Sequence, residues 1–404
     1  MSSPKVLYIS YNAATDPVAQ SQVIPYVEKL AEYGIDISLL TYEKKHDNPT
    51  SEFHKALKER LARSGIRWYR LKYHKRPSLP ATIYDILQGV IFTYFLVLTR
   101  KFNVIHARQI VPATICMALR RIIKFKWVFD MRGLFAEECV AHGWREWGLK
   151  YRLVKLMEKD SLLSADFITV LTRRQKELMS GWPFLSDKTI EVIPCCVDLS
   201  KFSIVEKDPD LVDELGLQQK FVLIYLGSLG TCYLLAEMMD FFLHLRGKVN
   251  NAFFLFVTHS DKNLIIDMAK EKGLEDGSFS VIKSPFEDIP AILSVGDAGI
   301  YFINPYMKFG SFPIKLGEYL ACGLPVIINS GIGDSEDIVR DHGIGTIIDD
   351  FSADRYERSL SELLGLLTKK DILKERCREA AGRYLSLTTG TQRYKHIYNT
   401  LSID

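Results

Sequence analysis

Short apolar segments alternate along the chain with longer segments in which apolar residues recur at helical spacing. This alternation is typical of parallel sheets covered by helices on both faces. In the first half we interpret as strands the segments 5–10, 35–41, 104–106, 127–130, 167–171 and 190–194. In the second half the corresponding segments are 221–226, 253–258, 280–282, 298–303, 325–329 and 345–348. Each half therefore predicts one doubly wound α/β unit.

The length of the chain supports two domains, since a single core stops growing at about 250–300 residues and the chain has 404. Segment 195–220 breaks the periodicity with turn-forming residues, as a linker does. We predict an N-terminal domain at 1–194, a C-terminal domain at 195–382 and a terminal helix at 383–404. We expect this helix to pack back on the first domain through an apolar stripe of Tyr384, Leu387, Tyr394, Ile397, Tyr398 and Leu401.

The longest apolar run, 86–98, is about 13 residues long, shorter than the roughly 20 that cross a bilayer as a helix. It fits either a helix buried against a sheet or a helix that contacts a membrane interface. The first residues lack the pattern of a secretory signal, and seven scattered cysteines indicate reduced thiols rather than a disulfide framework. We therefore predict a cytoplasmic protein.

Charge is divided unevenly between the halves. Up to Asp198 the chain has 30 Lys and Arg against 20 Asp and Glu, and after it 22 against 29, which gives +10 and −7. A basic half attracts anionic lipid headgroups or phosphorylated acceptors. The alternative is a solvated surface whose charge only attracts the two domains to each other.

The segment 309–330 (FGSFPIKLGEYLACGLPVIINS) is the most informative part of the sequence. A Gly/Ser/Pro turn leads into a predicted helix at about 313–322, and the free backbone N–H groups at a helix start form an anion site suited to a nucleotide diphosphate. Pro313 suits the first turn, where its missing donor is harmless. Lys315 lies in that turn against the usual dipole preference, which indicates a bound anion.

Glu318 lies one turn further along the same predicted helix. Its carboxylate can accept two hydrogen bonds from the hydroxyls of a ribose. The alternative is a solvent-facing side chain paired with Lys315, which would contribute little.

The first half contributes two further groups of polar residues. Arg132 directly follows a strand, and a guanidinium stays charged and donates in two parallel directions, which suits a phosphate; the alternative is an ion pair with Glu137 or Glu138. After the first strand, a loop–helix junction carries short polar groups that suit an acceptor or the transferred sugar, or else cap the helix. These are Asn12, Asp16, Gln20 and Ser21.

Neither a metal nor a cofactor is expected. The acids Asp334, Glu336 and Asp337 suit the positive end of a helix dipole, and the nine histidines show no zinc-type spacing. The aromatic and cationic segment 67–76 is not accompanied by a nucleic-acid-binding module, so it favours a lipid or glycan surface. We predict no nucleic-acid partner.

The segment around Glu318 resembles the donor-binding signature of the retaining glycosyltransferases grouped as family 4. That signature has two Glu separated by seven residues, followed by Ala-x-Gly-x-Pro-Val. Glu318 matches the second Glu, which holds the donor ribose in the family. The residues that match the remainder are Ala321, Gly323, Pro325 and Val326. Gly310 stands in the place of the first Glu, which leaves the backbone N–H groups of Ser311 and Phe312 to contact the sugar.

The beginning of the second half, YLGSLGTCYLL, also resembles the family. Gly227 matches the family's glycine turn, but Ser228 stands where the family has an Arg, and no Lys follows before the helix. We therefore propose Lys315 and Arg132 as the cations that hold the diphosphate.

The resemblance covers nearly the whole chain and implies the GT-B fold, in which two Rossmann-like domains bind the acceptor and the nucleotide-sugar donor respectively. It implies retaining sugar transfer to a glycan or lipid-linked acceptor in cell-surface polysaccharide synthesis. From the basic N-terminal half we expect a peripheral location on the inner face of the cell membrane. Two alternatives remain open. One is a non-catalytic homologue that binds a glycan or a partner enzyme, and the other is a nucleotide-sugar epimerase.

Overall fold

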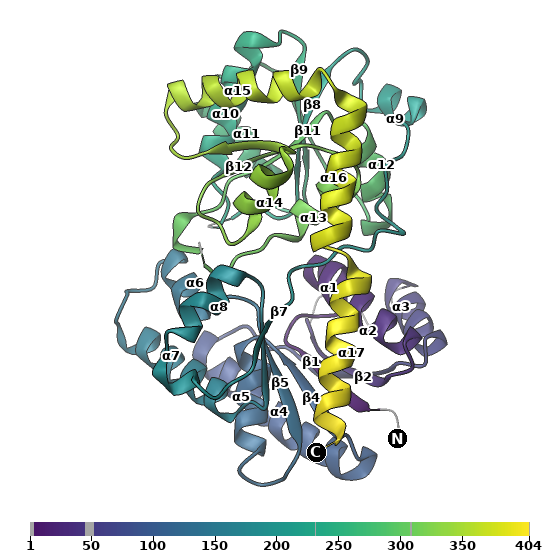
Figure 1. Cartoon of the computed structure of the whole chain (residues 1–404), viewed down its shortest axis with the longest axis vertical. Coiled ribbons are helices and arrows are strands. Elements are labelled where there is room, and N and C mark those ends of the chain that lie inside the picture. The colour runs from purple at the N-terminus through teal and green to yellow at the C-terminus, as the bar shows by residue number, and fades with distance from the viewer. Residues whose placement is uncertain (1–3, 45–51, 231, 308, 404) are drawn as a thin grey trace. The chain divides into compact units, whose positions relative to one another are not determined.

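A computed structural model describes residues 4–44, 52–230, 232–307 and 309–403 (Figure 1). The chain forms two compact units. Unit 1 comprises Met1–Pro194 and Leu387–Asp404, and unit 2 comprises Cys195–Ser386. Residues 1–3 and 404, at the ends of the predicted domains, lie outside the described residues.

Unit 1 is built on a parallel sheet of seven strands in the order β3-β2-β1-β4-β5-β6-β7. The strands are β1 (Lys5–Ser10), β2 (Asp36–Glu43), β3 (Arg67–Lys72), β4 (Val104–Arg108), β5 (Lys126–Met131), β6 (Phe167–Val170) and β7 (Ile190–Val192). The helices are α1 (Pro17–Gln22), α2 (Ile24–Glu32), α3 (Glu52–Arg63), α4 (Ser78–Arg100), α5 (Ile110–Leu119), α6 (Phe135–Ala141), α7 (Leu149–Ser164), α8 (Arg173–Ser180), the 3-10 helix η1 (Pro183–Leu185) and α17 (Leu387–Ile403).

Unit 2 is built on a parallel sheet of six strands in the order β10-β9-β8-β11-β12-β13. The strands are β8 (Phe221–Leu226), β9 (Ala252–Val257), β10 (Phe279–Ile282), β11 (Ala298–Tyr301), β12 (Val326–Asn329) and β13 (Gly345–Ile348). The helices are α9 (Pro209–Glu214), α10 (Leu235–Lys248), α11 (Lys262–Glu271), α12 (Ile289–Ser294), α13 (Ile314–Ala321), α14 (Ser335–His342), α15 (Ala353–Leu367) and α16 (Lys370–Tyr384), with the 3-10 helices η2 (Phe286–Asp288) and η3 (Pro305–Met307).

The predicted fold class is confirmed, and each apolar segment interpreted as a strand forms one. Most of these strands are buried throughout or nearly so, as in β9, where all six residues are buried, whereas all four residues of the edge strand β10 are partly exposed. Strand β3 was not predicted, because this edge strand pairs only with β2 and carries charged residues at 67, 70 and 72. Charges are common on edge strands, where they prevent pairing with other chains. The predicted linker also contains a short helix, α9, in which the backbone N–H of Asp210 donates to the side chain of Asp208.

The order of the strands reverses at one point in each sheet, between β1 and β4 in unit 1 and between β8 and β11 in unit 2. In open parallel sheets, ligands bind beyond the carboxyl ends of the strands at this point. The fold thus directs attention to the loops that follow β1 and β4, and to those that follow β8 and β11.

The last helix, α17, packs against α2, β4 and β5 of unit 1, although it follows unit 2 in the sequence (Figure 1). Its predicted apolar stripe is buried at Leu387, Tyr394, Ile397, Tyr398 and Leu401. Tyr384 instead ends α16, so the division between the units falls after Ser386 rather than after 382.

Helix α4 is longer than the apolar run that the sequence shows. Its residues Leu79–Arg100 are long and apolar enough to cross a membrane by length and composition. One side of the helix is nevertheless built into unit 1, because Asp85 and Thr93 are fully buried and Leu96 nearly so.

We expect Ile397→Ala to lower the free energy of unfolding of unit 1 by about 2–4 kcal/mol, because it leaves a cavity under α17. Ile397 is 0% exposed. Urea unfolding followed by circular dichroism measures the loss. The matched control is Ile372→Ala in α16, where the side chain is 61% exposed and a change within about 0.5 kcal/mol is expected. Equal effects of the two substitutions would contradict the assigned packing of α17.

Candidate functional site

Helix α13 carries two ionisable side chains that are both buried, Lys315 at 4% and Glu318 at 5% exposure. The helix begins at Ile314 and follows Pro313, which is in an extended conformation, and no side chain caps its first N–H groups. The predicted helix start at 313 is therefore one residue early, but Lys315 does lie in the first turn. Burying two charged groups is unfavourable unless partners compensate the loss of water.

The ammonium group of Lys315 is surrounded by tyrosines. Its Nζ donates a hydrogen bond to the Tyr225 hydroxyl at 3.1 Å and lies 4.2 Å from the centre of the Tyr225 ring and 3.5 Å from that of Tyr233. Burial nevertheless holds the pKa of Lys315 well below its ordinary value, while Glu318 acts in the opposite direction. Burial thus disfavours the charged form of this side chain, and an anion placed beside it would raise the pKa again.

Gly227 leaves this amine accessible from the end of β8. Its φ of 110° lies in a region that favours glycine, and a Cβ at this position would lie 3.3 Å from Lys315 Nζ. The next residue, Ser228, accepts a 2.6 Å hydrogen bond from the Tyr225 hydroxyl through its carbonyl. The structure thus brings together Gly227, Ser228 and Lys315.

Glu318 lies one turn further along α13 on the same side. Burial raises the pKa of its carboxyl to about 7, although Lys315 acts to lower it. Among the described residues, the carboxylate has no hydrogen-bonding partner. The predicted alternative of a solvent-facing residue is wrong for Glu318, because the side chain is buried.

The loop before α13 positions the remaining predicted donor residues. Gly310 and Phe312 are buried, and Pro313 precedes the helix. The backbone N–H of Ser311 donates to the carbonyl of Met307 at 3.2 Å, so in this state it is not available to a sugar. Of the two predicted backbone donors, only that of Phe312 lacks an acceptor among the described residues.

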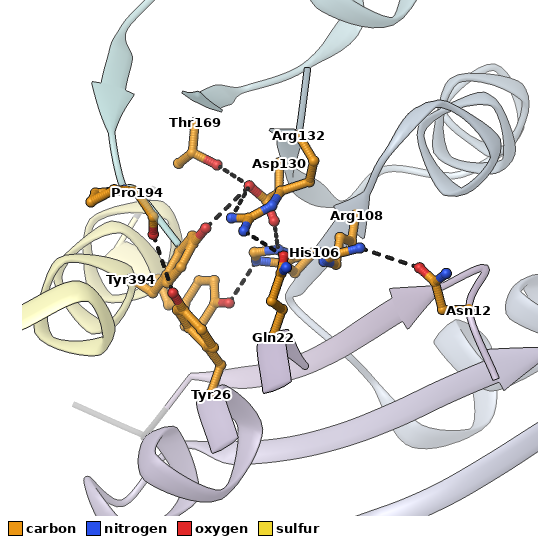
Figure 2. Close-up of polar contacts among 11 residues, drawn as sticks. Asn12, Gln22, Tyr26, His106, Arg108, Asp130, Arg132, Thr169, Pro194 and Tyr394 are labelled. Carbon is orange, nitrogen blue, oxygen red and sulfur yellow. Dashed lines mark hydrogen bonds and ion pairs between the residues drawn. The ribbon is translucent and has the colours of Figure 1, made fainter. Parts of the chain in front are cut away.

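Arg132 lies in unit 1, just after β5, and its side chain is only 4% exposed (Figure 2). Its guanidinium lies 3.6 Å from Asp130 and donates to the Gln22 side chain at 3.0 Å. Gln22 also accepts from Arg108 at 2.8 Å. Glu137, one of the predicted alternative partners, contacts Lys155 at 3.1 Å. Arg132 is therefore held rigidly by its own unit.

Asp130 is the centre of this buried network. It accepts hydrogen bonds from Thr169 and from Tyr394 of α17 (Figure 2). Burial acts to raise the pKa of Asp130, but the charge of Arg132 and the contact with His106 hold it below its ordinary value.

His106 lies between Asp130, at 3.4 Å, and the hydroxyl of Tyr398, at 2.7 Å. Burial lowers the pKa of His106, so the ring is neutral near pH 7. The network therefore fixes α17 to the carboxyl ends of β4 and β5.

The polar residues predicted after β1 have separate partners. Asn12 accepts from Arg108 at 3.3 Å, and Asp16 precedes α1 but pairs with Lys44 at 2.5 Å rather than capping the helix. Gln20 is buried and donates to the carbonyl of Ala14. Ser21 donates back to Pro17 within its helix. Only Asn12 is thus linked to the network that contains Arg132.

The sequence analysis missed Gln22, Asp130 and the tyrosines of α17 as members of the network. A signal was present, since β4 and β5 end in the polar residues Arg108 and Asp130, and parallel strands converge at their carboxyl ends. The spacing of Tyr394 and Tyr398 predicted only an apolar stripe, because the spacing of residues in the sequence does not show which group a hydroxyl bonds to.

One of the acids before and within α14, Glu336, has a structural role. Asp334 precedes the helix and Glu336 and Asp337 lie in its first turn. Glu336 accepts from the N–H of Gly331 at 2.8 Å and pairs with Arg340. No group of three metal-ligating side chains occurs within the described residues.

Two family models match the chain. The model described as Glycosyl transferase 4-like domain matches residues 21–196, and the model described as Glycosyl transferases group 1 matches residues 208–383. No curated protein sequence matches the chain.

Solved structures share the fold over nearly the full length. Sucrose-phosphate synthase from Thermosynechococcus elongatus has a TM-score of 0.79 at 17% identity, covering 99% of both chains. Anabaena HepE in complex with UDP and glucose has a TM-score of 0.72 at 12% identity, covering 99% of this chain and 100% of that one. WaaG, a glycosyltransferase involved in lipopolysaccharide biosynthesis, has a TM-score of 0.67 at 13% identity, covering 97% and 99%. Because the two family models together cover most of both units, the chain belongs to the group 1 glycosyltransferases, the family 4 enzymes with the GT-B fold.

Proposed function

We propose that this glycosyltransferase moves a sugar from a nucleotide-sugar donor to a glycan or lipid-linked acceptor in the synthesis of cell-surface polysaccharide, with retention of configuration. The observation that carries the proposal is the pair of buried ionisable residues on α13, Lys315 and Glu318, beside Gly227 at the end of β8. HepE, which shares the fold, has been crystallised with UDP-glucose. Unit 2 is the proposed donor domain and unit 1 the proposed acceptor domain.

The proposed donor site assigns one part of the nucleotide sugar to each group. The diphosphate lies at the uncapped amino end of α13, where Lys315 supplies a positive charge. The ribose hydroxyls donate to the Glu318 carboxylate, and the N–H of Phe312 contacts the sugar. Arg132 is the second cation, which Asp130 and Gln22 hold in a fixed orientation.

In the transfer step the bond between the anomeric carbon and the phosphate oxygen breaks, and a bond to the acceptor oxygen forms on the same face of the sugar. The acceptor hydroxyl proton passes to the departing phosphate. Negative charge therefore grows on the diphosphate, and Lys315, Arg132 and the N–H groups of α13 stabilise this charge more in the transition state than in the ground state. Because the protein supplies these positive charges, the reaction needs no metal ion, and we expect a chelator to leave turnover unchanged.

The acceptor site is proposed at the loop after β1, where Asn12 contacts Arg108. The same proposal assigns Asp16, Gln20 and Ser21 a supporting role, since each hydrogen-bonds within unit 1. A lipid-linked acceptor requires access to a membrane, so we propose a cytoplasmic enzyme bound peripherally to the inner face of the cell membrane.

Nucleotide release from a panel of nucleotide sugars, measured with and without an acceptor extract, tests the reaction. We expect release that depends on the acceptor. A changed sugar without any acceptor would indicate an epimerase. Binding without any turnover would indicate a non-catalytic homologue, and either result would overturn the proposal.

Glu318→Ala should weaken donor binding roughly 10- to 100-fold, since a hydrogen bond to a charged group contributes about 1.5–3 kcal/mol. Isothermal titration calorimetry measures the affinity, and circular dichroism verifies the fold. The matched control is Glu362→Ala, which removes an exposed carboxylate from α15 and should leave affinity unchanged. Unchanged affinity in Glu318→Ala would remove this residue from the donor site.

Donor binding should take up protons in the pH range between the lowered pKa of Lys315 in the free protein and the ordinary pKa of a lysine, because a diphosphate beside the amine raises its pKa again. Calorimetry in buffers of different ionisation enthalpy measures this uptake. In Lys315→Met we expect the Lys315 contribution to disappear and kcat/KM to fall about 100-fold, as when one donor to a developing negative charge is removed. If Lys315→Met took up as many protons on donor binding as the wild type, the diphosphate would have to bind away from Lys315.

A further inference from the structure

Helix α4 presents an unbroken apolar stripe on the outside of unit 1. Apart from the adjacent Ile83 and Tyr84, its members recur every three or four residues, and each is between 50% and 60% exposed. They are Leu79, Ile83, Tyr84, Leu87, Ile91, Phe95 and Leu98. From Ile83 to Leu98 the stripe is about 22 Å long at the rise of an α-helix. Contiguous exposed apolar patches of this kind mark interaction surfaces rather than ordinary protein surface.

The stripe carries no charge. Helix α4 contains two charged residues, Asp85 and Arg100. Asp85 is fully buried on the opposite side, where it accepts hydrogen bonds from Tyr11 at 2.7 Å and lies 2.6 Å from His74. Arg100 is the last residue of the helix.

The opposite side of α4 is fixed in unit 1, so the stripe cannot turn inward. Gly89 packs so closely on Tyr42 and Ile115 that a Cβ at this position would overlap both side chains. Tyr42 also donates to the carbonyl of Asp85 at 2.9 Å. Only 33% of the most apolar window of the helix is buried. One side of the helix is therefore part of the folded unit, and the apolar stripe on its other side remains exposed.

Exposed cations lie at both ends of the stripe. Lys75 and Arg76 precede α4, and Arg100 and Lys101 end it. The turn after α5, which packs against α4 (Figure 1), adds a third group. Its members are Arg121, Ile122, which is 65% exposed, and Lys124. None of these six cations has an ion-pair partner among the described residues.

We infer that the outer face of α4 lies in the interface of an anionic phospholipid bilayer, with its apolar stripe among the acyl chains and its terminal cations on the headgroup phosphates. Amphipathic helices that lie in the membrane plane combine these two features, apolar burial and attraction to anionic lipid. The inference names the surface behind the peripheral membrane location proposed above, on which it rests, but it does not depend on the transfer reaction.

The charge pattern favours a bilayer over a second copy of the chain. A two-fold interface places the same patch of both copies face to face. With cations at both ends of the stripe, either a parallel or an antiparallel pairing of α4 helices would bring cations against cations. An anionic bilayer instead supplies the complementary charge at both ends of the stripe and an apolar phase between them.

Co-sedimentation of the full chain with vesicles tests the inference. We expect binding to phosphatidylcholine vesicles that contain phosphatidylglycerol, weaker binding at high salt because the headgroup attraction is screened, and much weaker binding to phosphatidylcholine alone. Absence of binding to the anionic vesicles at low salt would overturn the inference.

The variant Ile91→Glu/Phe95→Glu should reduce partitioning into anionic vesicles at least about tenfold, since two apolar side chains lose their burial in lipid. Its matched control is Leu264→Glu/Ile372→Glu in unit 2, where the two side chains are 53% and 61% exposed and binding should persist. Thermal unfolding verifies that both variants fold. Equal binding by both would overturn the assignment of the surface.

The variant Arg100→Gln/Lys101→Gln should reduce the salt dependence of binding to anionic vesicles, whereas Lys262→Gln/Lys270→Gln on α11 should not.

Size-exclusion chromatography coupled to light scattering tests the alternative that a second copy of the chain covers the stripe. A dimer that Ile91→Glu/Phe95→Glu dissociates, without vesicle binding, would show a second copy on the stripe. Donor affinity measured in the same variants should match the wild type, so a failed donor site and a failed membrane surface give different results.

Discussion

The arrangement of unit 2 depends on the free energy of burying an amine. Lys315 extends from the first turn of α13 to the end of β8, away from bulk water, and the rings of Tyr225 and Tyr233 compensate only part of the lost hydration. A helix start with uncapped N–H groups adds positive potential at the same place. Glycine at 227 keeps the approach clear. Together these features make a site whose unfavourable electrostatics are relieved by an anion, which a diphosphate supplies.

Unit 1 solves the burial of charge in a different way. Arg132, Asp130 and His106 compensate one another through short contacts, and Gln22 joins Arg132 to Arg108. Hydrogen bonds from Thr169 and Tyr394 to Asp130 help to hold these side chains in one orientation. The contrast is between a network in unit 1 whose charged side chains face one another and a buried lysine and glutamate in unit 2 whose loss of hydration is less fully compensated.

The sequence predicted most of the fold, because strands buried on both faces are continuous apolar runs that need no knowledge of their neighbours. It did not predict elements that depend on tertiary contacts. An example is β3, whose charged residues form a strand because they pair with β2. For the site, a turn, a lysine and a glutamate at helical spacing were enough to place Lys315 and Glu318 together. Their environment was not predictable, because Tyr225 and Tyr233 are far from them in sequence, and the N–H of Ser311 is engaged by a residue in an irregular loop. Tyr394 of α17 reaches Asp130 across 264 residues of sequence, which no local pattern reveals.

That long separation affects how the protein forms during translation. Chains are synthesised from the N-terminus, and domains generally fold as units when they are complete. All of unit 2 leaves the ribosome before α17 does, so unit 2 can fold while Asp130 and His106 still lack the tyrosine hydroxyls that bury them. The apolar face of α2 that packs against α17 therefore stays uncovered while all of unit 2 is synthesised. Unit 1 is therefore completed only after unit 2, although most of its residues are synthesised first.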